Sequence, residues 1–171
     1  RVIRDGDGVI TSVHFGPINI ASEETSGIDL SASYRLRTAN AGDFRFTGNH
    51  TWVYRHRSQQ YPGDPWENLL DVSEALAPRA KSNLGMSWDK GQFGGSLFGT
   101  YLGRLANYDN DAWTPSTWRF NAGARYDVND HLRVALSVNN LLNKMPPVDP
   151  TWANYPYYDT SWFDSMGRSY Y

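Results

Sequence analysis

The chain of 171 residues contains no cysteine and no excess of either charge. The absence of cysteine excludes disulfides, thiolate metal sites and cysteine nucleophiles. Sixteen basic and 18 acidic side chains give a formal net charge of −2, so no basic surface indicates a nucleic-acid partner. No apolar run approaches the roughly 18 to 20 residues that a membrane helix requires. These absences exclude a disulfide scaffold, a nucleic-acid-binding module and a helical membrane protein.

Catalytic and metal-binding motifs are also missing. The sequence has no G-x-S-x-G, H-E-x-x-H or P-loop pattern. His50 and His56 lack neighbouring carboxylates for a metal site. The stretch D-G-D-G at residues 5–8 begins like a calcium loop, but no acidic residue follows at the bidentate position, so a hairpin turn is the better interpretation. We therefore expect no catalytic residue, no metal and no cofactor.

Aromatic residues are abundant in a chain that is otherwise polar. They make up 15% of the residues, including 7 Trp and 11 Tyr, while the mean hydropathy is −0.61. A transmembrane β-barrel has both properties, because each strand faces lipid on one side and a polar lumen on the other.

Strict alternation of apolar and polar residues is the strongest pattern in the chain. In residues 27–37 every second side chain is apolar and its neighbours are polar or charged, as in a strand with one apolar face. Phe98 interrupts one of the weaker repeats. About eight antiparallel strands are predicted: residues 9–20, 27–37, 44–52, 83–89, 93–101, 117–128, 132–139 and 166–171.

The predicted connections are of two kinds. Residues 4–8, 38–42, 90–92 and 129–130 are short and turn-forming. Residues 56–79, 104–115 and 144–165 are long and rich in Pro, Trp and Tyr. Outer-membrane barrels show this asymmetry, with short periplasmic turns and long extracellular loops. Pro17 lies inside a predicted strand, where we expect a bulge.

Aromatic residues also gather at the two ends of the predicted strands. Such rings favour the two membrane interfaces, because they are apolar but carry a polar group. We expect one aromatic belt near the short turns and another near the long loops. The first contains Tyr34, Phe44, Trp88, Phe93 and Tyr126, and the second contains Trp52, Tyr54, Tyr101 and Trp118.

Three motifs carry a family resemblance. S-V-N-N-L-L-N-K at residues 137–144, followed by a long loop and then G-R-S-Y at residues 167–170, resembles the C-terminal end of a TonB-dependent outer-membrane receptor. N-I-A-S-E-E-T-S-G-I-D-L at residues 19–30 is similar to an earlier signature of that family, with Glu23 in place of the usual alanine.

The resemblance implies an all-β fold, an antiparallel up-and-down transmembrane β-barrel of roughly 22 strands around an N-terminal plug. On this interpretation residues 1–171 are the C-terminal portion of the barrel domain, without the plug. The implied function is active uptake of a scarce nutrient, an oligosaccharide or a siderophore-type ligand, across the outer membrane of a Gram-negative bacterium. The implied partners are outer-membrane lipid, the protein's own plug, TonB and the small-molecule or oligosaccharide ligand.

Two sets of residues are candidates for function. The first points into the lumen on the predicted register, where the resemblance implies contact with the plug: Arg35, Arg45, Arg119, Arg125 and Arg133. The second is aromatic and lies in the long loops, where it either packs internally or binds ligand: Trp66, Trp113, Trp152, Tyr157, Tyr158 and Trp162.

Alternative functions remain open at this point. A passive porin or a small outer-membrane barrel would show the same alternation, with a charged, water-filled lumen. A soluble β-rich carbohydrate-binding module is the second alternative. Few cations lie near the loops, which favours a sugar over an anionic ferric siderophore, with Asp149, Asp159 and Asp164 as acceptors for its hydroxyls.

Overall fold

The computed structural model describes residues 2–13, 21–73 and 78–171. Every regular element in these ranges is a β-strand, and there is no helix with the length and apolarity needed to span a bilayer. The strands are β1 (Val2–Arg4), β2 (Ile10–Val13), β3 (Ser22–Thr38), β4 (Gly42–Gln59), β5 (Glu67–Asn68), β6 (Ala80–Lys90), β7 (Phe93–Leu102), β8 (Leu105–Ala106), β9 (Trp113–Thr114), β10 (Thr117–Asn129), β11 (Leu132–Asn139) and β12 (Ser169–Tyr170).

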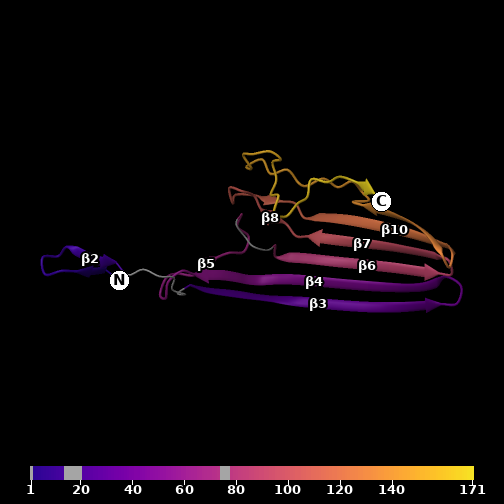
Figure 1. The fold of residues 1–171 in the computed structure, drawn as a ribbon, viewed down its shortest axis with the longest axis horizontal. Helices are drawn as coiled ribbons and strands as arrows, with labels where there is room; N and C mark the ends of the chain where they lie inside the picture. The colour runs from indigo at the N-terminus through magenta and orange to yellow at the C-terminus, as the bar shows by residue number, and fades with distance from the viewer. Residues whose placement is uncertain (1, 14–20, 74–77) are drawn as a thin grey trace.

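Eight strands form one sheet in the order β12-β11-β10-β7-β6-β4-β3, with β5 beside β4. All pairs are antiparallel. The tight turns lie together at one end of the sheet, here called the turn end, and the long connections lie at the other, the loop end (Figure 1). This arrangement confirms the predicted antiparallel, all-β, up-and-down architecture. Among the described residues, β3 and β12 do not pair with each other, so the sheet is open.

The register separates the side chains of the sheet into two faces. Directly opposed residues in antiparallel strands point to the same side, and the pairs run Leu30↔His50, Gly48↔Leu84, Met86↔Leu97 and Ala122↔Val138 without a change of face. The apolar face contains Ile28, Leu30, Phe46, Leu84, Leu97, Phe120, Val134 and Leu136. The polar face contains Arg35, Arg45, Arg119, Arg125 and Arg133. The alternation in the sequence therefore predicted both faces correctly.

Aromatic rings on the apolar face pair across neighbouring strands at both ends. Phe93 and Tyr126 have ring centroids 4.9 Å apart at the turn end, and Tyr101 and Trp118 have centroids 5.1 Å apart at the loop end. Small and aliphatic residues such as Leu84 lie between them. This placement matches the two predicted belts.

Strands β3 and β4 are longer than predicted. They have 17 and 18 residues, whereas a strand that spans a bilayer needs about 9 to 11. A register shift between Ser26 and Gly27 leaves Tyr54 as an extra residue in β4, and beyond this bulge the hairpin continues to Gln59. The prediction that residues 56–59 belong to a loop was wrong, because their backbone groups pair with β3 and β5.

The N-terminal segment also differs from its prediction. Residues 9–20 were expected to form one strand beside residues 27–37. Within the described part of this range β2 pairs with β1 in a separate two-stranded sheet, and residues 14–20 lie outside the described residues. The Asp5 carboxylate accepts the backbone N–H groups of Asp7 and Val9, which closes a tight hairpin and folds β2 back onto β1. In Figure 1 this hairpin lies apart from the tight turns at the turn end. Pro17 lies outside the described residues.

The last predicted strand is shorter than expected. Only Ser169 and Tyr170 are assigned to β12, and the backbone of Tyr171 exchanges two hydrogen bonds with Ser137. The backbone N–H groups of Met166 and Arg168 instead donate to the side chains of Asp164 and Asn143, respectively. These side-chain hydrogen bonds take the place of backbone pairing with β11, so the strand begins only at Ser169.

Candidate functional site

Three long connections gather at the loop end. The first loop is residues 60–79, the second 103–116 and the third 140–168; β5 lies in the first, and the β8–β9 hairpin lies in the second. Ser73 and Asn110 join the first two loops through a backbone N–H bond of 2.6 Å and a side-chain bond of 3.2 Å. The rings of Tyr108 and Trp152 join the second and third loops, with centroids 5.4 Å apart. We call this joined set the loop cluster.

Asp149 is the main polar link between the second and third loops. It is 3% exposed, and its carboxylate accepts the Tyr108 backbone N–H at 2.9 Å and the Thr151 hydroxyl at 2.7 Å. Burial raises the pKa of Asp149, but the hydrogen bonds from the Thr151 hydroxyl and from the N–H groups of Thr151 and Tyr108 outweigh it and lower the pKa below its usual value. Asp149 therefore holds the loops together and is not available to a ligand.

The third loop folds back over the polar face of the sheet. Tyr158 and Phe163 from this loop pack against Leu102 of β7, a polar-face position, to form a small buried cluster. Arg119 of β10 donates to the backbone carbonyl of Asp164 at 3.2 Å. The loop thus covers the outer part of the face that carries the arginines.

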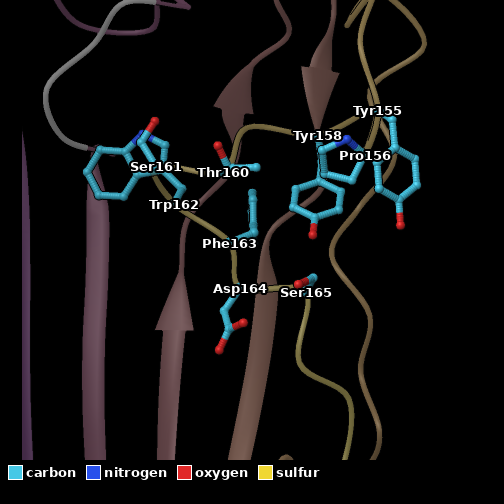
Figure 2. A pocket seen from close by; sticks show the side chains of 9 residues that line it. All are labelled: Tyr155, Pro156, Tyr158, Thr160, Ser161, Trp162, Phe163, Asp164 and Ser165. Carbon is cyan, nitrogen blue, oxygen red and sulfur yellow. The ribbon is translucent and has the colours of Figure 1, made fainter.

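An open pocket of about 480 Å³ lies within the third loop, between Tyr155 and Ser165. Figure 2 shows its side chains in front of the strands, with Trp162 at one end of the row and Tyr155 at the other. Tyr155 is 86% exposed. Thr160, Ser161 and Asp164 add hydroxyl and carboxylate groups to these rings. Flat rings beside hydrogen-bonding groups suit a ligand with an apolar face and a polar edge.

The asparagines of the S-V-N-N-L-L-N-K motif fix the base of the third loop. Asn140 is 2% exposed, and its side chain accepts the Lys144 N–H at 2.8 Å and donates to the Lys144 carbonyl at 3.0 Å. Asn140 and Asn143 have positive φ angles of 49° and 50°, a conformation that asparagine adopts more readily than most residues. The sequence analysis used this motif for resemblance alone and missed its structural role.

The predicted aromatic residues have different surroundings. Trp66 lies under the Arg57 guanidinium at 4.4 Å, and Trp113 lies under that of Arg104 at 4.0 Å. Trp152 packs on Tyr108, and the rings of Tyr157 and Tyr155 are 6.1 Å apart. Tyr158 and Trp162 line the pocket. Tyr155 also lines it but was not among the six predicted residues.

The arginines of the polar face form two arrangements. Near the turn end Arg125 lies across β7 to reach Asp89 and also binds Asp127, which in turn binds Arg133. The crossing needs glycine, because a Cβ at Gly94 would lie 2.8 Å from the Cγ of Arg125. Arg35 and Arg45, by contrast, directly face each other across β3 and β4, and like charges in this position repel.

The two histidines considered for metal binding have separate partners. His50 contacts the Ser82 hydroxyl at 2.7 Å on the apolar face, and His56 contacts Glu23 at 2.6 Å. The described part of the chain contains no group of three or more His, Cys, Asp or Glu residues placed to hold a metal.

The model of the family described as "TonB dependent receptor-like, beta-barrel" matches residues 2–141. The chain belongs to this family. Comparison with curated proteins and comparison with solved structures each gave no match. Membership identifies a receptor barrel of the TonB-dependent transport system of the outer membrane, and it agrees with the antiparallel sheet and its two faces.

Proposed function

We propose that this protein is an outer-membrane receptor that takes up an oligosaccharide by TonB-dependent active transport in a Gram-negative bacterium. The third loop is the ligand-binding element, and the sugar rings stack on Tyr155 and Trp162. The pocket in this loop supports the proposal, because its rings lie beside hydroxyl and carboxylate groups that suit the two faces of a sugar.

The two faces of the sheet support the placement in the membrane. The apolar face contacts outer-membrane lipid, with its aromatic pairs at the two interfaces. The polar face lines the lumen, since the third loop folds onto this side, and its arginines bind the receptor's own plug. The opposed Arg35 and Arg45 would be relieved by a carboxylate from the plug.

The test uses the intact receptor in cells with and without TonB. Labelled oligosaccharides should accumulate only where TonB is present. Because each lost ring contact weakens binding by about three- to tenfold, the double variant Tyr155→Ala/Trp162→Ala should need a higher sugar concentration for half-maximal uptake. Trp113→Ala removes an exposed loop tryptophan outside the pocket and serves as the control.

Two results would contradict the proposal. Uptake that continues without TonB would indicate a passive porin. Unchanged sugar uptake by a correctly inserted double variant would exclude the pocket as the sugar-binding site.

A further inference from the structure

A second pocket lies between the third loop and the polar face of the sheet. Its volume is about 420 Å³. The sheet contributes two cationic side chains, Lys81 of β6 and Arg119 of β10, and the loop contributes the rings of Trp162 and Phe163. The rest of the wall consists of Leu102 and three uncharged polar residues of the sheet, with Ser161 of the loop: Thr100, Thr117 and Asn121.

The register places the two cations on opposite sides of β7. Lys81 pairs with Leu102, which pairs with Thr117, and Arg119 lies two residues further along β10. Strand spacing and rise put the two backbones about 12 Å apart. Long side chains from these positions can reach a single group above β7.

Neither cation is fully neutralised. Arg119 donates one hydrogen bond, to the Asp164 carbonyl, and its Nη1 lies 3.8 Å from the Asp164 carboxylate, outside hydrogen-bonding distance. Within the described ranges Lys81 has neither a hydrogen bond from its side chain nor an ion pair. Both retain donors for a carboxylate, which binds such cations in charge-assisted hydrogen bonds.

From this geometry we infer that the pocket binds the carboxylate of a uronic acid unit, so that the transported oligosaccharide is acidic. The carboxylate lies between Lys81 and Arg119, and the sugar ring packs on Trp162. Because Trp162 also lines the outer pocket, one chain of sugars can occupy both pockets. The inference rests on the proposed function and specifies its ligand.

The ligand carboxylate also competes with a residue of the third loop. The Asp164 carboxylate, which lines the outer pocket, lies 3.8 Å from Nη1 of Arg119. A bound uronate replaces the weak Asp164 contact with direct hydrogen bonds. Removing the negative charge of Asp164 should therefore raise the affinity for an acidic ligand relative to that for a neutral one.

The experiment measures binding by calorimetry to the intact receptor in detergent. The probes are oligogalacturonate and oligoglucuronate, each beside the same oligosaccharide with its carboxyl groups reduced to alcohols. The acidic form should bind about tenfold more tightly than the reduced form. Ferric citrate is a third probe, since it carries carboxylates without a sugar ring, and it should bind more weakly than the acidic sugars.

Variants then locate the effect. Lys81→Gln and Arg119→Gln should each lower the affinity for the acidic sugar about tenfold and leave that for the reduced sugar unchanged. Asp164→Asn should raise the affinity for the acidic sugar relative to that for the reduced sugar. Lys90→Gln, which removes a lysine at the turn end of the same strand, should change neither.

Several outcomes would overturn the inference. Acidic and reduced sugars could bind equally, or Lys81→Gln could lose equal affinity for both sugars. Ferric citrate could bind more tightly than any sugar. Lys81→Gln could also have a lower melting temperature with unchanged sugar affinity, which would assign the lysine to plug contacts. TonB-dependent uptake of neutral sugars without acidic preference would reject this inference and leave the proposed function intact. The absence of any TonB-dependent sugar uptake would reject both.

Discussion

The apolar face of the sheet and the loop cluster bury their apolar residues in opposite ways. On the sheet Leu84 and Val134 are 49% and 57% exposed, whereas Tyr158 and Phe163 in the third loop are 7% and 9% exposed. On the proposed placement in the outer membrane, lipid replaces a protein core for the sheet, so its apolar residues need no protein neighbours. The loops then extend into water and must exclude it with a small core of their own. Apolar residues of the same chain are therefore exposed on the sheet and buried in the loop cluster.

The largest effect is expected from the core of the loop cluster. Phe163→Ala removes a ring that packs on Leu102 and Tyr158, and such a change costs about 3 kcal/mol or more. In the intact receptor, amide hydrogen exchange should rise in the second and third loops, while the strands stay protected. Tyr155→Ala, at an exposed position of the same loop, is the control. Unchanged protection in Phe163→Ala would show that the loops have no core of their own.

A charge on the apolar face should have the next largest effect. Leu84 lies midway along β6, and an arginine on the lipid side near the membrane centre costs about 2 to 4 kcal/mol. Leu84→Arg should lower the free energy of unfolding of the receptor in lipid vesicles, as measured by urea titration. Asn83→Arg, one residue away on the polar face, should cost much less. Equal costs would mean that the two faces do not differ in environment.

Acid should weaken the contact between the second and third loops. Because the pKa of Asp149 is lower in the folded protein, its contribution is fully present above its usual pKa near 3.8 and is lost as the pH falls through the lower, folded-state value. Hydrogen exchange at Tyr108 and Thr151, corrected for the intrinsic effect of pH, should stay constant between about pH 7 and 5 and increase below the usual pKa. In Asp149→Asn this acid dependence should disappear. Its persistence in the variant would assign the effect to another group.

The smallest effect is expected at the surface of the second loop. Arg104 lies 4.0 Å above the Trp113 ring, and an exposed cation–π contact contributes about 0.5 to 1 kcal/mol. Arg104→Gln should change loop stability by no more than this amount in a double-mutant cycle with Trp113→Leu. A coupling well above that range would indicate that the pair is part of the loop core.

The sequence predicted the sheet well because alternation is a local property. In residues 27–37 and 117–128 apolar and polar side chains alternate, and this pattern alone assigns the two kinds of side chain to opposite faces of the sheet. The same reasoning failed at residues 10–13, which pair with β1 and not with residues 27–37, since the alternation there was too weak to exclude a hairpin. The D-G-D-G stretch correctly predicted a hairpin turn, since the Asp5 carboxylate closes the turn that pairs β2 with β1.

The candidate site was only partly predictable. The third loop was correctly identified as rich in aromatic residues, but the division between packing and exposed rings was not visible. Trp152 and Trp162 look alike in the sequence, yet one packs on Tyr108 and the other lines both pockets. The difference depends on residues about 40 positions away, which no local pattern contains.

The sequence by itself therefore determined the central strands of the sheet, their two faces, the aromatic belts and the family, because each depends on neighbouring residues or on a short motif. Only the tertiary structure decided which residues meet at the loop end. The contact of Ser73 with Asn110, the link from Asp149 to Tyr108 and the pocket that Lys81, Arg119 and Trp162 share all join segments distant in the chain. Such contacts are set by strand order and by the folding of the third loop onto the sheet.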